Sequence, residues 1–265
     1  MLFSSCQKLL VITIDGSSDP GDIITKQPSY VNVDTTTLQG ITKAKHFGLV
    51  SSGLADVIVI RDIFQANVLF DPMHRGRIFA MFCHPVERAF NHYNDKKQAA
   101  VTDPHYNAEI SSMTLEQFAN SPYMEHDPLT RYLSNQVEGP LSQVNLNQAM
   151  DILRRKVLVG LLDKRELSMA RFEKFFNWKY RIQPEVQESC RKKYLGSTTS
   201  LKSRRDDKLL PGTLSYELLA SYNKFDIQLY NYIEILFEEQ SDFTKSYPDG
   251  YRLVDASCCV CDKTC

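Results

Sequence analysis

The feature that most constrains the fold of this chain is a series of short, continuous apolar runs separated by amphipathic stretches. The runs are "ADVIVI" (55–60), "RIFAMFC" (77–83) and "VLVGLL" (157–162). Such runs are typical of strands that are buried on both faces. Amphipathic stretches follow the first two runs at short spacing. Strand, helix, strand and helix in this order predict an α/β fold with a parallel sheet and crossover helices.

Local signals place further elements. "KLLVITID" (8–15) predicts another buried strand, Pro85 suits the first turn of a helix, and "TLEQ" (114–117) is a capping box. In the stretch 166–178, Met169, Phe172 and Phe176 fall on one helical face. Further helices are predicted at 36–49, 127–135, 146–156 and 183–194, and a last one at 223–240, with Asn223 as its N-cap and Phe225, Leu229, Ile233 and Leu236 buried.

Length and composition favour one globular domain. The 265 residues suffice for a large α/β core, and we expect a single domain over 1–246. The net charge of −1 argues against a nucleic-acid partner. No apolar run approaches the roughly 20 residues that cross a bilayer. The N-terminus is expected to be a poor signal peptide, because its apolar stretch is short and ends at Asp15 rather than at a small-residue cleavage site.

The seven cysteines do not decide the redox compartment. Four of them, Cys258, Cys259, Cys261 and Cys265, lie in the last eight residues. A soft-metal site or disulfides would suit such a cluster. Chain ends usually fray, and no histidine lies nearby, so we predict an unstructured tail over 247–265 and no metal.

The stretch "HRGRIFAMFCHPVERAFNHYND" (74–95) is the most informative for function. It joins a buried strand to a helix through the proline-led "PVER". An arginine at the end of such a strand and a hydroxyl on the first helical turns would give charged and neutral donors to a phosphate at the helix N-terminus.

This stretch resembles the strand–helix unit R-x-P-x-x-R-x-x-S of sulfotransferases that use 3′-phosphoadenosine 5′-phosphosulfate (PAPS). "KVLVGLLDKRELSMARFEKFF" and "YELLASYNKFDIQLYNYIEILFEEQ" are similar to later segments of the same family, particularly its glycan-sulfating, algal-type branch. The resemblance runs from about Tyr30 to Gln240. It implies a three-layer sandwich with a central parallel sheet, in the P-loop-like fold of these enzymes.

The chain departs from the family motif at two positions. The first arginine of the motif falls on Cys83 and its serine on Asn91, while Pro85 and Arg88 match. A lost buried arginine removes a charge-assisted contact of about 1.5–3 kcal/mol, whereas Asn91 can still donate a hydrogen bond. The alternative for Arg88 is an ordinary solvated helix face.

A second departure concerns the loop that binds the 5′-phosphosulfate, in which backbone N–H groups and a lysine hold the anion. Lys26, Lys202 and Lys245 are the nearest candidates, and none follows a strand with the required glycines. The resemblance therefore implies a domain that is incomplete at its N-terminus, with weak binding of adenosine 3′,5′-bisphosphate and negligible turnover.

Two further site predictions follow from the resemblance. Sulfuryl transfer needs a base near the acceptor oxygen. Among Asp62, Asp71 and His74 we take His74 as the candidate; each could instead be a cap, a turn residue or a surface group. The basic loop at 197–208 would close over the donor through Ser197, Lys202 and Arg204, or could be a solvated loop.

The sequence thus leaves two functions open. One is transfer of a sulfuryl group from PAPS, without a metal, to a hydroxyl acceptor such as a glycan. The other is a non-catalytic remnant that binds an anionic glycan or a nucleotide. A P-loop kinase is disfavoured, because no Walker lysine is present. A Golgi location rests on family analogy alone.

Overall fold

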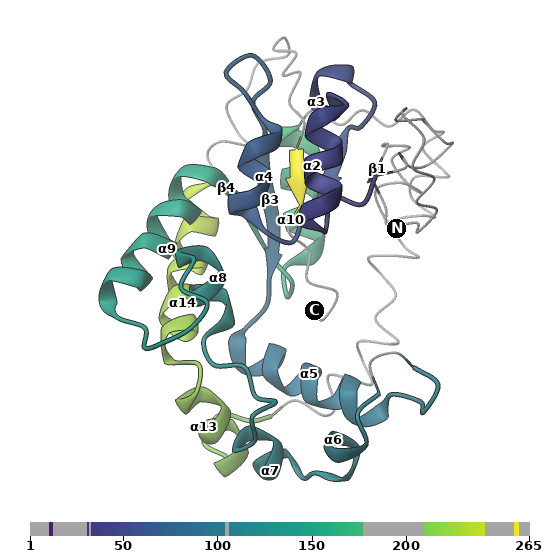
Figure 1. Ribbon diagram of the computed structural model, residues 1–265. Coiled ribbons are helices and arrows are strands. Elements are labelled where there is room, and N and C mark those ends of the chain that lie inside the picture. Colours follow the sequence, from purple (N-terminus) through teal and green to yellow (C-terminus); the bar gives the residue numbers. More distant parts are fainter. Residues whose placement is uncertain are drawn as a thin grey trace, which may run out of the picture. The chain divides into compact units, whose positions relative to one another are not determined.

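The computed structural model describes residues 11–12, 31, 33–103, 106–176, 209–241 and 257–259 (Figure 1). These residues pack into two compact units. The sheet unit takes its residues from 1–81, 155–198 and 237–261, and the helical unit takes its residues from 82–154 and 199–236. The division is one of packing along a continuous chain, so the single domain expected over 1–246 stays a prediction.

The described strands form one sheet, in the order β1-β2-β5-β3-β4. β1 pairs in parallel with β2, and β5 pairs in parallel with both β2 and β3. The mixed α/β character and the parallel sheet are therefore confirmed. All three strands that the apolar runs predicted are present in this sheet. The bounds are β1 Val11–Ile12, β2 Val57–Val59, β3 Arg77–Phe82, β4 Val157–Leu161 and β5 Ser257–Cys259.

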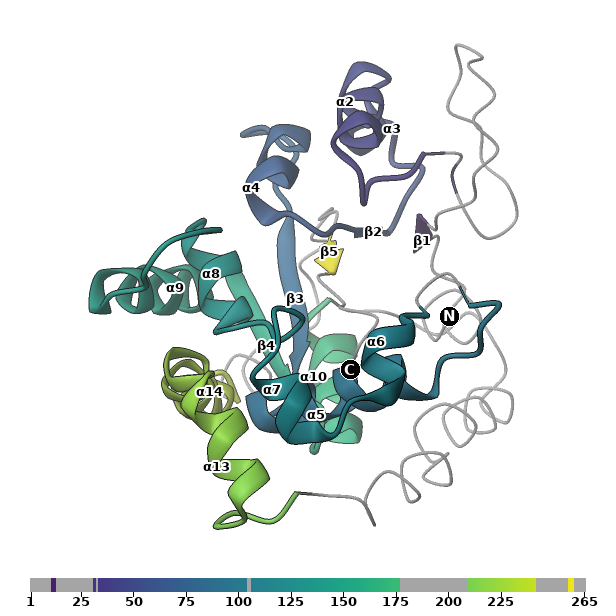
Figure 2. The same cartoon turned by 60° about the horizontal axis from the view of Figure 1, so that its bottom comes forward.

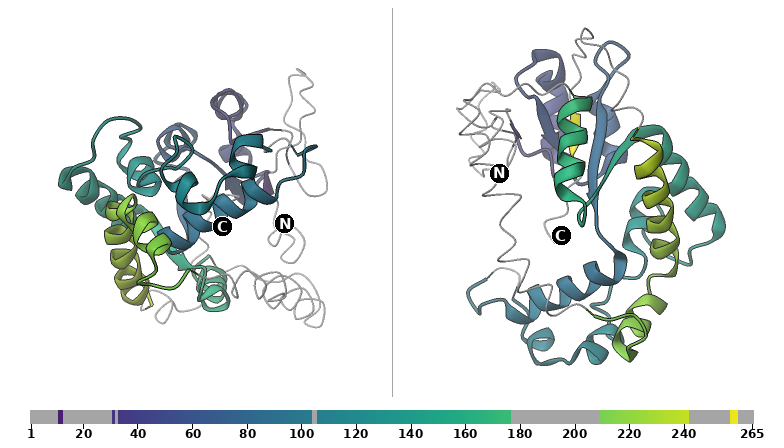
Figure 3. Two further views of the ribbon diagram at one scale, coloured as in Figure 1. Left: turned by 90° about the horizontal axis from the view of Figure 1, so that it is seen from below. Right: turned by 180° about the vertical axis from the view of Figure 1, so that it is seen from behind.

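Helices cover both faces of this sheet (Figures 2 and 3). Ile58 and Ile60 face the cluster built on α2, α3 and α4, and Val57 and Phe79 face α10. Successive strand residues point to opposite faces, so an apolar run without alternation buries both. The aromatic rings of Phe79 and Phe172 lie 5.0 Å apart on the α10 side. The bounds are α2 Leu38–His46, α3 Leu49–Ser52, α4 Ile63–Ala66, the 3-10 helix η1 Asn67–Leu69 and α10 Arg165–Phe175.

Strand β4, at the end of the sheet order, is held by side chains as well as by its neighbour. The Gln240 side chain accepts a hydrogen bond from the Val159 N–H and donates one to the Val157 carbonyl, both at 2.8 Å. Ser168 on α10 is fully buried, and its Oγ accepts a hydrogen bond from the Leu161 N–H at 2.9 Å. These bonds satisfy buried backbone groups that would otherwise cost free energy.

The helical unit packs around an apolar cluster that includes Val86, Tyr93, Phe118 and Leu219. The capping box at Thr114 is confirmed, because both of its reciprocal hydrogen bonds are present. The predicted helices at 127–135 and 146–156 are also confirmed. The bounds are α5 Pro85–Gln98, α6 Ala108–Ser112, α7 Leu115–Ala119, α8 Pro128–Ser134, α9 Gln143–Lys156, α13 Leu214–Ser221 and α14 Lys224–Glu239.

The predicted side-chain cap of α14 is wrong. Asn223 precedes the helix as expected, but its side chain donates to the Leu219 carbonyl at 2.8 Å. The N–H groups of Phe225 and Asp226 donate instead to the Asp127 carboxylate at 2.8 and 2.9 Å. A carboxylate binds the N–H groups at a helix N-terminus more strongly than an amide oxygen does, which favours Asp127 as the partner.

The start of α8 is capped in the same way, by a carboxylate from α14. The Asp226 carboxylate accepts hydrogen bonds from the N–H groups of Leu129 and Thr130 at 3.0 and 2.7 Å. Asp127, which precedes α8, therefore caps α14, and Asp226, in the first turn of α14, caps α8. Burial raises the pKa of both carboxyls above the usual value, although the N–H donors act in the opposite direction.

The remaining expectations concern the cysteine-rich tail, one predicted helix and a membrane span. Ser257–Cys259, from the cysteine-rich segment, form β5, so these three residues are part of the sheet. The rest of 247–265 lies outside the described residues, as does the predicted helix at 183–194. Among the helices that the structure describes, none is both long and apolar enough to span a bilayer.

Candidate functional site

The turn between β3 and α5 carries the predicted donor residues. His84 is the N-cap of α5, and its Nδ1 accepts a hydrogen bond from the Val86 N–H at 3.3 Å. The His84 carbonyl accepts one from the Arg88 N–H at 2.9 Å. Pro85 is buried at the first helical position, where a missing N–H costs no hydrogen bond. The predicted helix start at Pro85 is confirmed.

Aromatic side chains fix the orientation of the His84 ring. The ring stacks on Tyr216 with centroids 6.3 Å apart and meets Tyr230 edge-on at 5.3 Å. Tyr230 is buried and Tyr216 is half-buried. Such edge-on and stacked contacts stabilise a ring orientation beyond the area they bury. The turn that begins α5 is therefore held by backbone, imidazole and tyrosine contacts within the helical unit.

Arg88 supplies the positive charge of this region, but an acidic side chain already contacts it. Its Nη1 and Nη2 atoms both donate to Oε2 of Glu125 at 3.0 Å. The Arg88 side chain is only 13% exposed, whereas that of Glu125 is 50% exposed. Nδ1 of His92, one helical turn after Arg88, lies 3.8 Å from the same oxygen. The alternative of an ordinary solvated helix face does not fit Arg88, which belongs to a partly buried charge cluster.

The two positions that depart from the family motif lie on either side of this turn. Cys83 follows the last residue of β3 and is half-buried. Its thiol brings no positive charge to the strand end where the resemblance expects an arginine. Asn91 lies in the second turn of α5 and is also half-buried. Of the four predicted donor residues here, Arg88 alone contributes a full charge.

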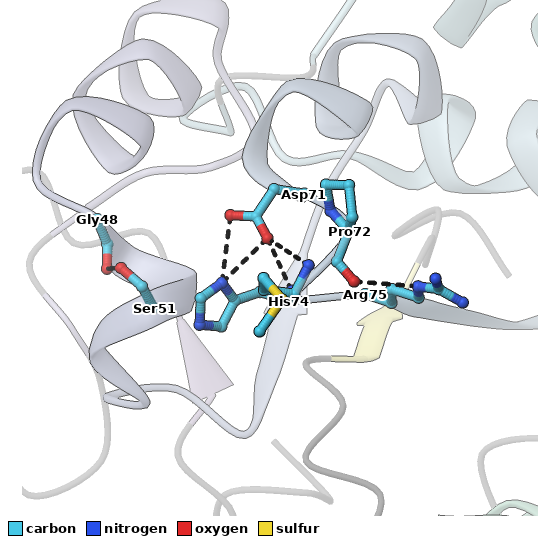
Figure 4. Close-up of polar contacts among 7 residues, drawn as sticks. Gly48, Ser51, Asp71, Pro72, His74 and Arg75 are labelled. Carbon is cyan, nitrogen blue, oxygen red and sulfur yellow. Dashed lines mark hydrogen bonds and ion pairs between the residues drawn. The ribbon is translucent and has the colours of Figure 1, made fainter.

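His74, the candidate base, lies in a turn of the sheet unit (Figure 4). Its Nδ1 lies 3.1 and 3.2 Å from the two carboxylate oxygens of Asp71. The Asp71 carboxylate also accepts the N–H groups of Met73 and His74, both at 2.8 Å. The backbone and side-chain hydrogen bonds from His74 hold the pKa of Asp71 below its usual value.

This geometry orients the imidazole. When the carboxylate accepts a hydrogen bond from Nδ1–H, Nε2 of the neutral ring is left as the proton acceptor. The same contacts also close a turn of the kind that aspartate often forms with the next backbone N–H groups. Asp62, the other acidic residue considered, caps α4 by accepting from the N–H groups of Phe64 and Gln65.

The remaining predicted site residues, Ser197, Lys202 and Arg204, lie outside the described residues. Within the part of the chain that is described, no three histidine, cysteine, aspartate or glutamate side chains gather in a way that could hold a metal.

Sequence reasoning missed Glu125 and His92. His92 had a local signal, because it follows Arg88 by four residues and therefore shares its helical face. Glu125 had none, since it lies 37 residues from Arg88 in the connection between α7 and α8.

Comparisons with known proteins add no family assignment. No protein-family model matches the chain, and searches of curated proteins and of solved structures found no significant match.

Proposed function

We propose that this chain is a sulfotransferase-like protein of P-loop-like, three-layer fold, and that the β3–α5 turn is the 3′-phosphate end of a site for PAPS. The observation that carries the proposal is the strand–turn–helix unit. A strand of a parallel sheet leads directly into α5, with Pro85 and Arg88 at matching positions of the family motif and Asn91 in place of its serine. The N-terminus of α5 adds a partial positive charge that favours a phosphate.

In the reaction we propose, a hydroxyl of a glycan attacks the sulfur atom of PAPS. A new S–O bond forms to the acceptor, and the S–O bond to the 5′-phosphate breaks, so that adenosine 3′,5′-bisphosphate leaves with the bonding electrons. The acceptor hydroxyl gives its proton to a base. His74 is the residue that we propose for this step, because Asp71 orients its ring with Nε2 as the acceptor.

Binding without transfer is the second candidate, and the donor turn favours it. Cys83 brings no charge, and Glu125 already neutralises Arg88. The residues therefore fit a 3′-phosphate only in part. A site with one engaged arginine and one helix N-terminus would bind such a phosphate weakly.

Restoring the motif tests the nucleotide site. We expect the double substitution Cys83→Arg with Asn91→Ser to lower the dissociation constant of adenosine 3′,5′-bisphosphate about ten- to hundredfold, measured by calorimetry. Adenosine 5′-monophosphate is the control, and its affinity should barely change because it has no 3′-phosphate. Equal gains for both nucleotides would indicate nonspecific charge attraction, and no gain for either would contradict the proposal.

A transfer assay with labelled PAPS separates the two functions. Sulfate transfer to a glycan that falls in a His74→Gln variant, with nucleotide affinity unchanged, would support catalysis with His74 as the base. Nucleotide binding without transfer would support the non-catalytic function. Transfer that survives His74→Gln would contradict the role proposed for His74.

A further inference from the structure

We infer that Glu125 is an internal competitor for the anion site on α5, so that a ligand phosphate must displace the Glu125 carboxylate from Arg88 before it binds. This inference rests on the proposed function, and it adds a residue that sets the affinity of the site. Its basis is the arrangement of Arg88, His92 and Glu125 within the helical unit.

The carboxylate occupies the place that an oxyanion would take. One oxygen, Oε2 of Glu125, accepts hydrogen bonds from both terminal nitrogens of Arg88 and lies 3.8 Å from His92 Nδ1. A phosphate oxygen could accept the same two N–H groups, because guanidinium binds carboxylate and phosphate with similar geometry. Phosphate has three such oxygens and up to two charges, so the exchange favours the ligand once the carboxylate moves.

The exposed fractions of the three side chains indicate which of them is free to change its rotamer. The side chains of Arg88 and His92 are 13% and 17% exposed, and that of Glu125 is 50% exposed. Glu125 lies in the connection between α7 and α8, next to the buried Met124. These four side chains lie together with Ala89 and Phe118, and they leave no room for a water molecule between them. Rotation of the Glu125 side chain towards solvent would open the Arg88 guanidinium without disturbing the apolar cluster.

The test is the affinity for adenosine 3′,5′-bisphosphate of Glu125→Gln compared with the unchanged chain. Glutamine keeps the size and one acceptor but loses the charge, and a half-exposed ion pair contributes modestly, so we expect the dissociation constant to fall about three- to tenfold. Glu109→Gln is the matched control, because it removes one carboxylate from the same unit at α6, where it accepts from the Tyr123 hydroxyl. Its affinity should stay unchanged.

Two further variants keep the outcomes distinct. In the double variant Glu125→Gln, Arg88→Gln, the gain in nucleotide affinity should be lost. If Glu125→Gln does not fold, Glu125→Ala is measured in its place. If Arg88→Gln abolishes binding while Glu125→Gln leaves affinity unchanged, Glu125 is no competitor and the nucleotide site stands. A gain of equal size in Glu109→Gln also overturns the inference. The proposed site and this inference both fall if Arg88→Gln binds the nucleotide as tightly as the unchanged chain does. They also fall if no variant binds the nucleotide, including the Cys83→Arg, Asn91→Ser double variant.

Discussion

Gln240 takes the place of a strand residue beside β4, and we predict that its replacement by leucine strongly destabilises the protein. Its side-chain amide accepts from the Val159 N–H and donates to the Val157 carbonyl, both at 2.8 Å. These two groups point to the same side of β4, and a neighbouring parallel strand would pair with them in the same pattern. Gln240 is buried, with 4% of the residue exposed.

The expected cost follows from what leucine leaves behind. Leucine preserves most of the volume, so the main effect is one buried N–H and one buried carbonyl without partners. Each such group costs about 1–3 kcal/mol, which gives a loss of about 2–6 kcal/mol in the free energy of unfolding. That is a large part of the 5–15 kcal/mol that stabilises a typical domain.

Urea denaturation followed by circular dichroism measures this loss. Gln228→Leu is the matched control, because Gln228 is exposed on α14 and its side chain bonds only the Lys224 carbonyl in the same helix. We expect that variant to stay within about 0.5 kcal/mol of the unchanged chain. A Gln240→Leu chain as stable as the control would show that the β4 backbone groups find other partners, and the reasoning would be wrong.

Three further predictions concern stability. Burial raises the pKa of Asp226, so its ionised form opposes folding. The contribution of Asp226 to the free energy of unfolding is therefore most favourable below its unfolded pKa of about 4, and it declines as the pH rises through the folded pKa. Asp226→Asn should therefore destabilise the chain less at pH 7 than at pH 4 in urea titrations, and a deficit that grows with pH would contradict this. Gly160→Ala would bring a Cβ to 2.6 Å from the Met81 sulfur and the Phe172 ring, and we expect a loss of about 1–3 kcal/mol by thermal unfolding, with an unchanged midpoint as the refuting result. Thr114→Ala removes one bond of the α7 capping box and should cost about 1 kcal/mol, whereas Thr114→Ser should cost little.

The sequence by itself determined where most described strands and helices lie. β2, β3 and β4 were predicted because a strand buried on both faces requires a continuous apolar run, which is visible locally. The start of α5 at Pro85 and the capping box at Thr114 were predicted for the same kind of reason, since each involves residues within one helical turn. The candidate residues of the donor turn were also found locally, because they follow one motif on one strand and one helix.

Only the tertiary structure decided which side chains complete these elements. Asp127 caps α14 across 98 residues, and Gln240 pairs with β4 across 81. Glu125 reaches Arg88 across 37 residues, which makes this arginine half of a partly buried ion pair. A hydrogen bond between distant residues leaves no periodicity or spacing in the sequence. Its partners are chosen by which buried donors and acceptors the packed elements bring within about 3 Å of each other.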